Sequence, residues 1–359
     1  MNRVAAWALV GGLIASAGLT AQKKKKEEIT QTLQLPKDLP GAVVGEPRRL
    51  TFHTTPLSAK GLLSVQARDA LKALMHETGG GSVLHIRAFV AGSGDLRRVR
   101  DLVSEAFTDH KQPLPSLSLV RAGGLPMEGA QVVLEAVAEG KKEVNPHGVA
   151  WVPASAASGD NPMDPVAPLV QQSLEKLRAN VKEAGSEPAD VLRVTCFLSA
   201  LDDIAAARKL VEAEYPRAAL DYVQTQRQPA HALAACEAVA RVHWNTGTAV
   251  HYIPAEGEHR AVLVNAPHVV FSGTQVSYGY QEADSRLAFE RLAKTLESVG
   301  VSGRQVAVAR YYPLAEVIAA QVRKLRAGFL GTPANSMLVM EGLPSMDAGF
   351  GVDVVAVKE

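Results

Sequence analysis

The sequence predicts an α/β (α+β) protein made of three tandem copies of one unit, with the sheets packed inward around a pseudo-threefold axis and the helices outside. One repeated pattern is a turn, strand, loop and closing strand, found at 115–138 and again at 333–358, with a looser copy at 216–240. A second pattern is a strand, a polar turn and a helix, found at 83–107, 191–215 and 306–329.

The helices of the second pattern are amphipathic. In the first copy Leu96, Val99, Val103 and Phe107 recur at steps of three and four residues, which places them on one helix face. The other copies repeat this spacing, although Gln321 interrupts the apolar stripe of the third copy. A further helix precedes the strand in each copy, and the glycines expected to end these helices are Gly79 to Gly81, Gly185 and Gly300.

Strands that alternate with helices place both helices of a unit on one face of its sheet. Strands such as 352–357 (VDVVAV) and 191–197 are apolar on both sides, so the opposite face must be buried as well. Packing three such faces around a pseudo-threefold axis buries all of them, because repeated like surfaces tend to close symmetrically. We therefore expect a monomer that acts as an intrachain trimer.

The first 21 residues resemble a secretory signal peptide. An apolar run at 4–19 follows one Arg, and Ala21 is a plausible cleavage point. Lys23 to Lys26 follow directly, which leaves an uncleaved anchor open. We expect a periplasmic or secreted protein, with a membrane-anchored one as the alternative. The predicted segments are 1–21 signal peptide or membrane anchor, 22–48 tether, and three units at 49–140, 141–243 and 244–359.

Composition excludes some functions. The formal net charge is +1 and the sequence pI is about 7.8, so the strongly basic face of a nucleic-acid-binding domain is not expected. The histidines lack metal-ligand spacing, and no metal or cofactor is expected. We interpret Cys196 and Cys236 as small buried apolar residues and leave their pairing open, since a disulfide needs Cα atoms within about 7 Å.

Four stretches carry a resemblance to a known family. They are QQSLEKLRANVKEAGSEPADVLRVTCFLSALDD (171–203), VVFSGTQ (269–275), AFERLAKTLESVG (288–300) and PANSMLVMEGLP (333–344). In this order they resemble the Rid family, also called the YjgF or L-PSP family. The resemblance covers roughly residues 49–358, and it is strongest in the middle and last copies.

The resemblance implies a fold like that of chorismate mutase, and trimers with a small pocket at each interface. Active members of the family are hydrolases that convert imines and enamines, such as 2-aminoacrylate, to 2-keto acids and ammonia. An Arg in a PAR-S turn clamps the substrate carboxylate, and a Glu on the last strand and an S-G turn complete the pocket. The partner implied for this chain is therefore an imino acid, a keto acid or a similar small carboxylate.

The clamping Arg is missing from its expected position in all three copies. The position holds Leu117 in the first copy, Ala218 in the middle copy and Asn335 in the last. Arg217 lies one residue before the middle position, where a one-residue slip would turn its side chain to the other face. Arg217 is thus the one candidate for a catalytic guanidinium, and Asn335 is a candidate for binding the substrate.

The acidic position is also altered. It holds Val133, Ala235 and Gly351, and the acidic residues two places later, including Glu135, match a second acidic position that we interpret as structural. The S-G turn survives only as Ser272-Gly273, which we predict to bind substrate. These residues predict a divergent imine or enamine deaminase-like protein. The alternative is a non-catalytic carboxylate-binding or structural exported protein.

Overall fold

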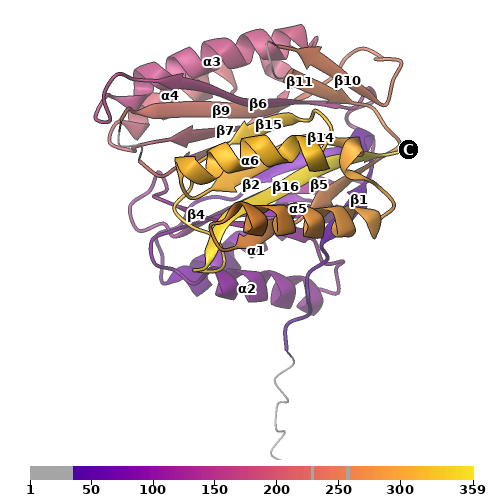
Figure 1. The fold of residues 1–359 in the computed structure, drawn as a ribbon, viewed down its shortest axis with the longest axis horizontal. Helices are drawn as coiled ribbons and strands as arrows, with labels where there is room; N and C mark the ends of the chain where they lie inside the picture. Colours follow the sequence, from indigo (N-terminus) through magenta and orange to yellow (C-terminus); the bar gives the residue numbers. More distant parts are fainter. Residues whose placement is uncertain (1–34, 228–229, 256–258) are drawn as a thin grey trace, which may run out of the picture. The chain divides into compact units, whose positions relative to one another are not determined.

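Three β-sheets, each covered by two helices, make up the described part of the chain (Figure 1). The computed structural model describes residues 35–227, 230–255 and 259–359. The apolar run at 4–19, expected as a signal peptide or anchor, lies outside these residues. Within the described ranges, no helix is both long and apolar enough to cross a membrane.

The first unit forms a four-stranded sheet in the order β2-β5-β3-β4. β3 runs parallel to β4, so a crossover must connect them, and helix α2 provides it. The predicted apolar stripe of α2 is buried at all four positions. The elements are β2 (Leu50–Thr54), α1 (Leu63–Glu77), β3 (Ser82–Ala91), α2 (Leu96–Asp109), β4 (Ser116–Ala122) and β5 (Val132–Glu139).

The second unit repeats this plan. Helix α3 ends as predicted, because Gly185 has a φ of +74° and the Ser186 N–H donates to the Val181 carbonyl at 3.1 Å. The elements are β6 (Val149–Ser158), α3 (Val166–Glu183), β7 (Val191–Leu198), α4 (Ile204–Glu214), β8 (Ala219–Gln224) and β9 (Leu233–Arg241).

The third unit differs only in detail. Its α6 buries Val322, while Gln321 stays partly exposed, so the interrupted stripe is completed one residue later. The elements are β12 (His268–Ser272), β13 (Gln275–Tyr278), α5 (Glu282–Glu297), β14 (Val306–Pro313), α6 (Glu316–Phe329), β15 (Ala334–Met337) and β16 (Ala348–Lys358).

Edge strands cross the expected boundaries between segments. β1 (Ala42–Gly45) lies inside the expected tether at 22–48, but it pairs with β12 at the edge of the third sheet. β10 (Val250–Pro254) and β11 (His259–Val264) follow the second unit in sequence and extend its sheet through β6. The prediction that residues 22–48 form a tether without strands is therefore wrong at Ala42–Gly45. A four-residue strand shows no period of its own, and only the distant partner reveals it.

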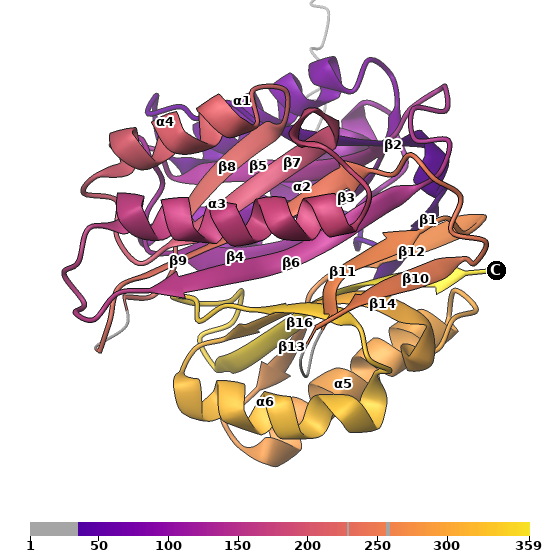
Figure 2. The same cartoon turned by 90° about the horizontal axis from the view of Figure 1, so that it is seen from above.

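The three units close into a ring, as predicted. β4 contacts β12, β15 contacts β6, and β8 contacts β2, so each unit packs against the next. The helices lie on the outer faces, with α3 and α4 on one side and α5 and α6 on another (Figure 2). Residues 36–359 form one compact unit. Equivalent aromatic residues of the three units meet in two shared cores, Phe52, Trp151 and Phe271 in one and Phe89, Phe197 and Tyr312 in the other.

The two cysteines are buried, as expected, and they form a disulfide, which answers the question of pairing that the sequence left open. Cys196 on β7 and Cys236 on β9 are opposite each other in the antiparallel pair, with Cα atoms 4.1 Å apart. Both are fully buried on the helix-covered side of the second sheet. The two strands could be predicted from the sequence, but their register could not. The register alone decides whether the thiols meet.

Candidate functional site: the clefts between units

Strand register identifies the equivalent positions in the three units. In each unit the short strand after the second helix runs parallel to the preceding long strand. The residue opposite Ile86 is Leu117, the residue opposite Val194 is Leu220, and the residue opposite Ala309 is Asn335. Leu117, Leu220 and Asn335 therefore occupy equivalent positions in the three units.

This register corrects the alignment of the middle copy. The equivalent position is Leu220, not Ala218, and Arg217 lies three residues before it. Arg217 is exposed in the turn between α4 and β8. Since α4 ends at Glu214 and β8 begins at Ala219, Arg217 is not in the strand position from which a clamping side chain would extend.

The acidic position is as the sequence predicted. Val133 is opposite Phe89, Ala235 is opposite Phe197, and Gly351 is opposite Tyr312. These three positions are equivalent, and none of them carries a carboxyl group.

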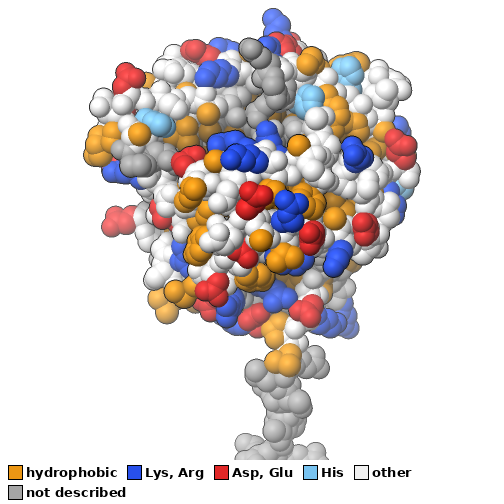
Figure 3. All heavy atoms as spheres, in the orientation of Figure 1, with side chains coloured by type: hydrophobic (Ala, Val, Ile, Leu, Met, Phe, Trp, Pro, Cys, Tyr) orange, Lys and Arg blue, Asp and Glu red, His pale blue; other side chains and the backbone are white. Residues whose placement is uncertain are grey.

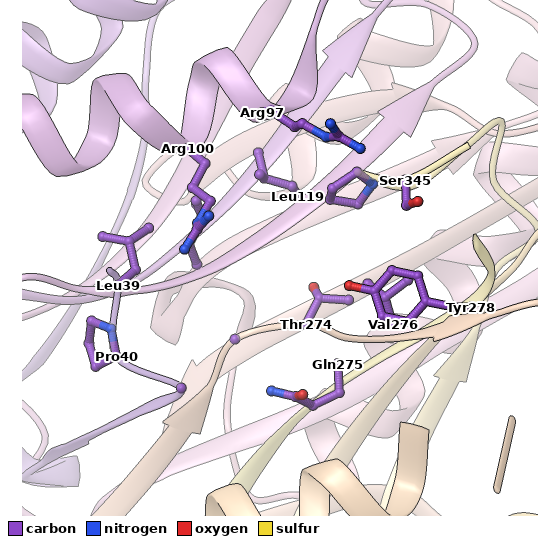
Figure 4. A pocket seen from close by; sticks show the side chains of 14 residues that line it. Leu39, Pro40, Arg97, Arg100, Leu119, Thr274, Gln275, Val276, Tyr278 and Ser345 are labelled. Atoms are coloured by element: carbon purple, nitrogen blue, oxygen red, sulfur yellow. The ribbon is translucent and has the colours of Figure 1, made fainter. Parts of the chain in front are cut away.

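A cleft of about 520 Å³ lies between the first and third units. Leu117 and Gly273 line it from the two sides, and the Thr274 N–H donates to the Leu117 carbonyl at 3.2 Å. A Cβ on Gly273 would lie 2.7 Å from that carbonyl oxygen, so the close approach of the units requires glycine here. Arg97 and Arg100 extend from α2 toward the cavity, opposite residues of the third unit (Figure 4).

Ser272 belongs to the sheet and not to this cleft. Its side chain is buried, and its Oγ accepts a hydrogen bond of 2.9 Å from the Val354 N–H. The hydroxyl is thus engaged inside the third sheet. Of the predicted Ser272-Gly273 pair, only Gly273 lines the cavity.

A second cleft, of about 300 Å³, lies between the second and third units. Asn335 lines it, and Arg326 on α6 donates a hydrogen bond to the Asn335 side-chain oxygen. Ala235, at the acidic position of the second unit, is on the opposite wall. The predicted site residues are therefore dispersed, with Gly273 in one cleft, Asn335 in another, and Arg217 on the surface.

A buried ionic cluster connects the three units on the inward faces of the sheets. We call it the axial cluster, and it contains three guanidiniums and four carboxyl groups. Arg87 of the first unit pairs with Glu135 of its own unit at 2.6 Å and with Glu237 of the second at 2.7 Å. The cluster consists of Arg87, Arg193, Arg310, Glu135, Glu237, Asp353 and Asp221, all buried.

Hydroxyl groups complete the axial cluster across the unit boundaries. Ser118 of the first unit donates to Asp353 of the third at 2.8 Å. Ser336 of the third unit donates to Glu237 of the second at 3.1 Å. Asp221 occupies the equivalent position in the second unit, because Ser118, Asp221 and Ser336 are opposite Arg87, Thr195 and Arg310 in the three parallel strand pairs.

Charge balance explains the protonation of the cluster. Burial alone would raise the pKa of Glu237, but Arg87, Arg310 and Arg193 hold it at about 2. Burial and the charge of Glu135 raise the pKa of Asp221 well above its ordinary value. The cluster has one carboxyl group more than it has guanidiniums, and the raised pKa of Asp221 favours its protonated form. Its Oδ2 has no hydrogen-bond partner among the described residues.

Comparison with known proteins identifies the family of this chain. No family model matches the chain. A RutC family protein of Haemophilus influenzae is 33% identical over 102 residues, which cover 28% of this chain and 72% of that protein. A RutC family protein of Pasteurella multocida is 32% identical with the same coverage. The chain belongs to the RutC (Rid) family.

Solved structures of Rid proteins align with about one unit each. A YjgF-family protein of Neisseria meningitidis covers 31% of this chain and 95% of its own, at 19% identity and a TM-score of 0.24. A Rid-family protein of Yersinia pestis covers 31% of this chain and all of its own, at 16% identity and a TM-score of 0.28.

The arginines that line the clefts of this Rid protein were not predicted from the sequence, because they are on helices and not on the repeated strands. Arg326 follows the buried Val322 by four residues, which places it at the edge of the apolar stripe of α6. Arg97 directly follows the buried Leu96. The sequence does show that these charged residues flank an apolar helix stripe. It does not show which flank of a helix contacts a neighbouring unit.

Proposed function

We propose that this Rid protein binds a small carboxylate, of the imino-acid or keto-acid class, in the clefts between its units, and does not hydrolyse imines by the family's route. The observation that carries the proposal is the strand register. Leu117, Leu220 and Asn335 are equivalent in that register, and the absence of a guanidinium from this one position in all three strands supports a lost carboxylate clamp.

Loss of the acidic position supports the same conclusion. Val133, Ala235 and Gly351 cannot donate or accept a proton, and general acid–base catalysis needs a titratable group within reach of the reacting atoms. The equivalent acidic residues two places later are engaged in the axial cluster. Glu135 and Glu237 both pair with Arg87 and are fully enclosed, so they are withdrawn from a substrate in a cleft.

The clefts nevertheless keep features that suit a small anion. Arg97 and Arg100 line one cleft, and Arg323 and Arg326 line the other. A guanidinium presents paired N–H donors that match the two oxygens of a carboxylate. On the molecular face of Figure 3, by contrast, charges of both signs are interspersed, which does not favour a nucleic acid as the partner.

The direct test is a pair of measurements on the full chain. 2-Aminoacrylate is generated in situ and keto-acid release is timed, and we expect a rate equal to the uncatalysed background. Pyruvate is then titrated in a thermal-shift experiment, and we expect a rise in the unfolding temperature because a ligand that binds the native state stabilises it. Hydrolysis above background, or no response to any short carboxylate, would refute the proposal.

We also propose that the chain is exported. The apolar run at 4–19, followed by Ala21, supports a cleavable leader. The disulfide between Cys196 and Cys236 supports an oxidising compartment, since cytosolic thiols are kept reduced. Cell fractionation combined with the intact mass of the protein tests this. A mature chain that begins at residue 22 in the periplasm or medium is expected, and a full-length chain in the membrane or cytosol would contradict it.

A further inference from the structure

We propose that the cleft between the first and third units binds a short dicarboxylate, and that Arg97 and Arg100 of helix α2 contact its two carboxylates. This inference rests on the proposed function, because it assumes that the chain binds a small carboxylate. It names the cleft, the class of ligand and the two guanidiniums that recognise the ligand.

The lining of this cleft is positively charged. Among the described residues that line it, Arg97 and Arg100 carry charge, and the others are apolar or neutral. Two positive charges in one cleft attract an anion, and an anion with two negative charges balances both of them. The cleft between the second and third units differs, because Glu316 lines it together with the arginines.

The two arginines reach the cavity from one side. Arg97 and Arg100 are three residues apart on α2, and residues at this spacing are neighbours on a helix surface. Both side chains are exposed and extend toward the cavity, while Thr274 and Gln275 of the third unit are on the opposite wall (Figure 4). Two long side chains from one helix can therefore contact the two ends of one short ligand.

Asp38 shows that Arg100 accepts a carboxylate. The Asp38 Oδ1 lies 2.7 Å from the Arg100 Nη2. The Asp38 side chain is 95% exposed and the Arg100 side chain is 50% exposed, and an ion pair this exposed contributes little to stability. A ligand carboxylate can therefore replace Asp38 at Arg100 at a small cost in free energy.

The segment before β1 forms part of the cleft, since residues 39–41 line the cavity. The Ser104 hydroxyl donates to the Lys37 carbonyl at 2.7 Å, and the Gly273 N–H donates to the Gly41 carbonyl at 2.8 Å. The backbone is thus anchored to the first unit at one end and to the third unit at the other. The carboxylate between these anchors can turn away from α2 without moving the wall of the cleft.

Arg97 is the contact expected for the first carboxylate of a ligand. The ion pairs that α2 forms with described residues are those of Arg98 with Glu105 and of Arg100 with Asp38. Arg97 takes part in neither of these pairs, so a monocarboxylate should bind there. A second carboxylate adds the contact with Arg100, in competition with Asp38.

The size and the apolar surface of the cleft suit the rest of such a ligand. A volume of about 520 Å³ is sufficient for a dicarboxylate of about five carbons. Leu117, Leu119 and Val276 line the cleft with apolar side chains, which can pack against the carbons between the two carboxylates. A short chain with a charge at each end therefore matches both the apolar and the charged parts of the lining.

The test is isothermal titration of the full chain with 2-oxoglutarate and with 2-oxopentanoate, which has a methyl group in place of the second carboxylate. We expect 2-oxoglutarate to bind about tenfold more tightly, because it gains a charge-assisted hydrogen bond. Arg97→Gln should weaken the binding of both ligands about tenfold, since it removes the contact that they share. Arg100→Gln should weaken the binding of 2-oxoglutarate alone and so remove most of its preference.

Asp38→Asn should change the affinity in the opposite direction. It removes the carboxylate that competes for Arg100, so 2-oxoglutarate affinity should rise about threefold while 2-oxopentanoate affinity stays nearly constant. A merely structural role of Asp38 would not raise the affinity for one ligand alone. Arg98→Gln is the matched control, because it removes a guanidinium of the same helix that pairs with Glu105, and it should leave both affinities nearly unchanged. Unfolding temperatures measured without ligand show whether each variant is folded.

The failure of this inference can be distinguished from failure of the proposed function. If 2-oxopentanoate or pyruvate binds the unmodified chain and 2-oxoglutarate binds no more tightly, the dicarboxylate assignment is overturned and the proposed function stands. The same holds if Arg97→Gln and Arg100→Gln both keep the affinity for 2-oxoglutarate. If no short carboxylate binds the unmodified chain, both are overturned.

Discussion

The axial cluster and the clefts contain residues of the same strands, but they differ in charge. On β9, Glu237 points into the axial cluster while Ala235, two residues earlier, lines the cleft between the second and third units. On β15, Ser336 donates to Glu237 while its neighbour Asn335 lines the cleft. Complementary charges are present along the axis, and the matching cleft positions are apolar or neutral.

This difference separates the requirements of the fold from those of the reaction. Buried charges at the axis must be paired, because an unpaired charge in the interior is costly. Arg87 meets this requirement by bridging two units through Glu135 and Glu237. The clefts face solvent and carry no such requirement, so their side chains are free to differ from the family pattern without loss of the fold.

The largest effect is expected from removing a guanidinium at the axis. Arg87→Met leaves Glu135 and Glu237 buried beside an uncharged side chain, which should lower the free energy of unfolding by about 3–5 kcal/mol. Arg208→Met breaks an exposed pair with Glu212 and should cost less than about 1 kcal/mol. Denaturant unfolding measures both. Similar losses for the two variants would remove the distinction between axis and surface.

Removing the disulfide perturbs the protein at a place that is outside both the axial cluster and the clefts. Removing it with Cys196→Ala and Cys236→Ala together should lower the free energy of unfolding by about 2–4 kcal/mol, since the cross-link restricts the unfolded chain. Pyruvate affinity, measured by titration, should stay unchanged because the disulfide is on the helix-covered side of the second sheet. A changed affinity would show that the clefts depend on that core.

Asp221 is the exception within the axial cluster, and replacing it should stabilise the protein. Asp221→Ser would place a hydroxyl where Ser118 and Ser336 have theirs in the other units, able to donate to Glu135. Removing a buried unpartnered oxygen should raise the free energy of unfolding by about 1–3 kcal/mol at pH 7. Denaturant unfolding of both proteins between pH 7 and pH 4 measures it.

The pH dependence of this gain follows from the direction of the pKa shift. The folded chain raises the pKa of Asp221, so it binds that proton more tightly than the unfolded chain does. The destabilising effect of Asp221 is therefore absent below its ordinary value of 3.8 and grows as the pH rises above it. The advantage of Asp221→Ser should shrink on acidification, and a constant advantage would contradict a protonated Asp221.

Acid should also weaken the axial cluster of the unmodified chain. The pKa of Glu237 is held at about 2 by its guanidinium neighbours, below its ordinary value of 4.5. This depressed value contributes stability that is present above about pH 4.5 and is lost as the pH falls toward 2. Both proteins share this loss, so it cancels in their difference.

The smallest effect is expected from adding a guanidinium to a cleft. Leu117→Arg places the missing charge at the clamp position of the cleft that Gly273 also lines. A charge-assisted hydrogen bond contributes about 1.5–3 kcal/mol, so pyruvate affinity should rise about tenfold. Leu117→Gln is the neutral control and should change little. Equal affinities for the two variants, measured by titration, would show that a ligand does not reach this position.

The repeated units, their helix stripes and their closing strands could be predicted from the sequence, because each depends on local period. The ring followed from the need to bury both faces of strands such as β16. The alignment at Leu220 could not be predicted, since the middle copy differs in length and only the pairing of Arg193 with Ala219 fixes the register.

Contacts between units also could not be predicted from the sequence. Arg87, Glu237 and Asp353 come from three units far apart in the chain, and no local pattern shows that they meet. Glu135, Glu237 and Asp353 were interpreted as structural, and all three form buried ion pairs, but their arginine partners were not identified. The helix-borne Arg97 was missed for the same reason, because its importance depends on the neighbouring unit.

A crystal structure of the full chain soaked with pyruvate tests the central claim most directly. The account predicts density for the ligand in a cleft between two units, with its carboxylate oxygens within hydrogen-bond distance of an arginine that lines that cleft. Pyruvate bound at Arg217, or clefts left empty while pyruvate occupies another part of the molecule, would contradict it.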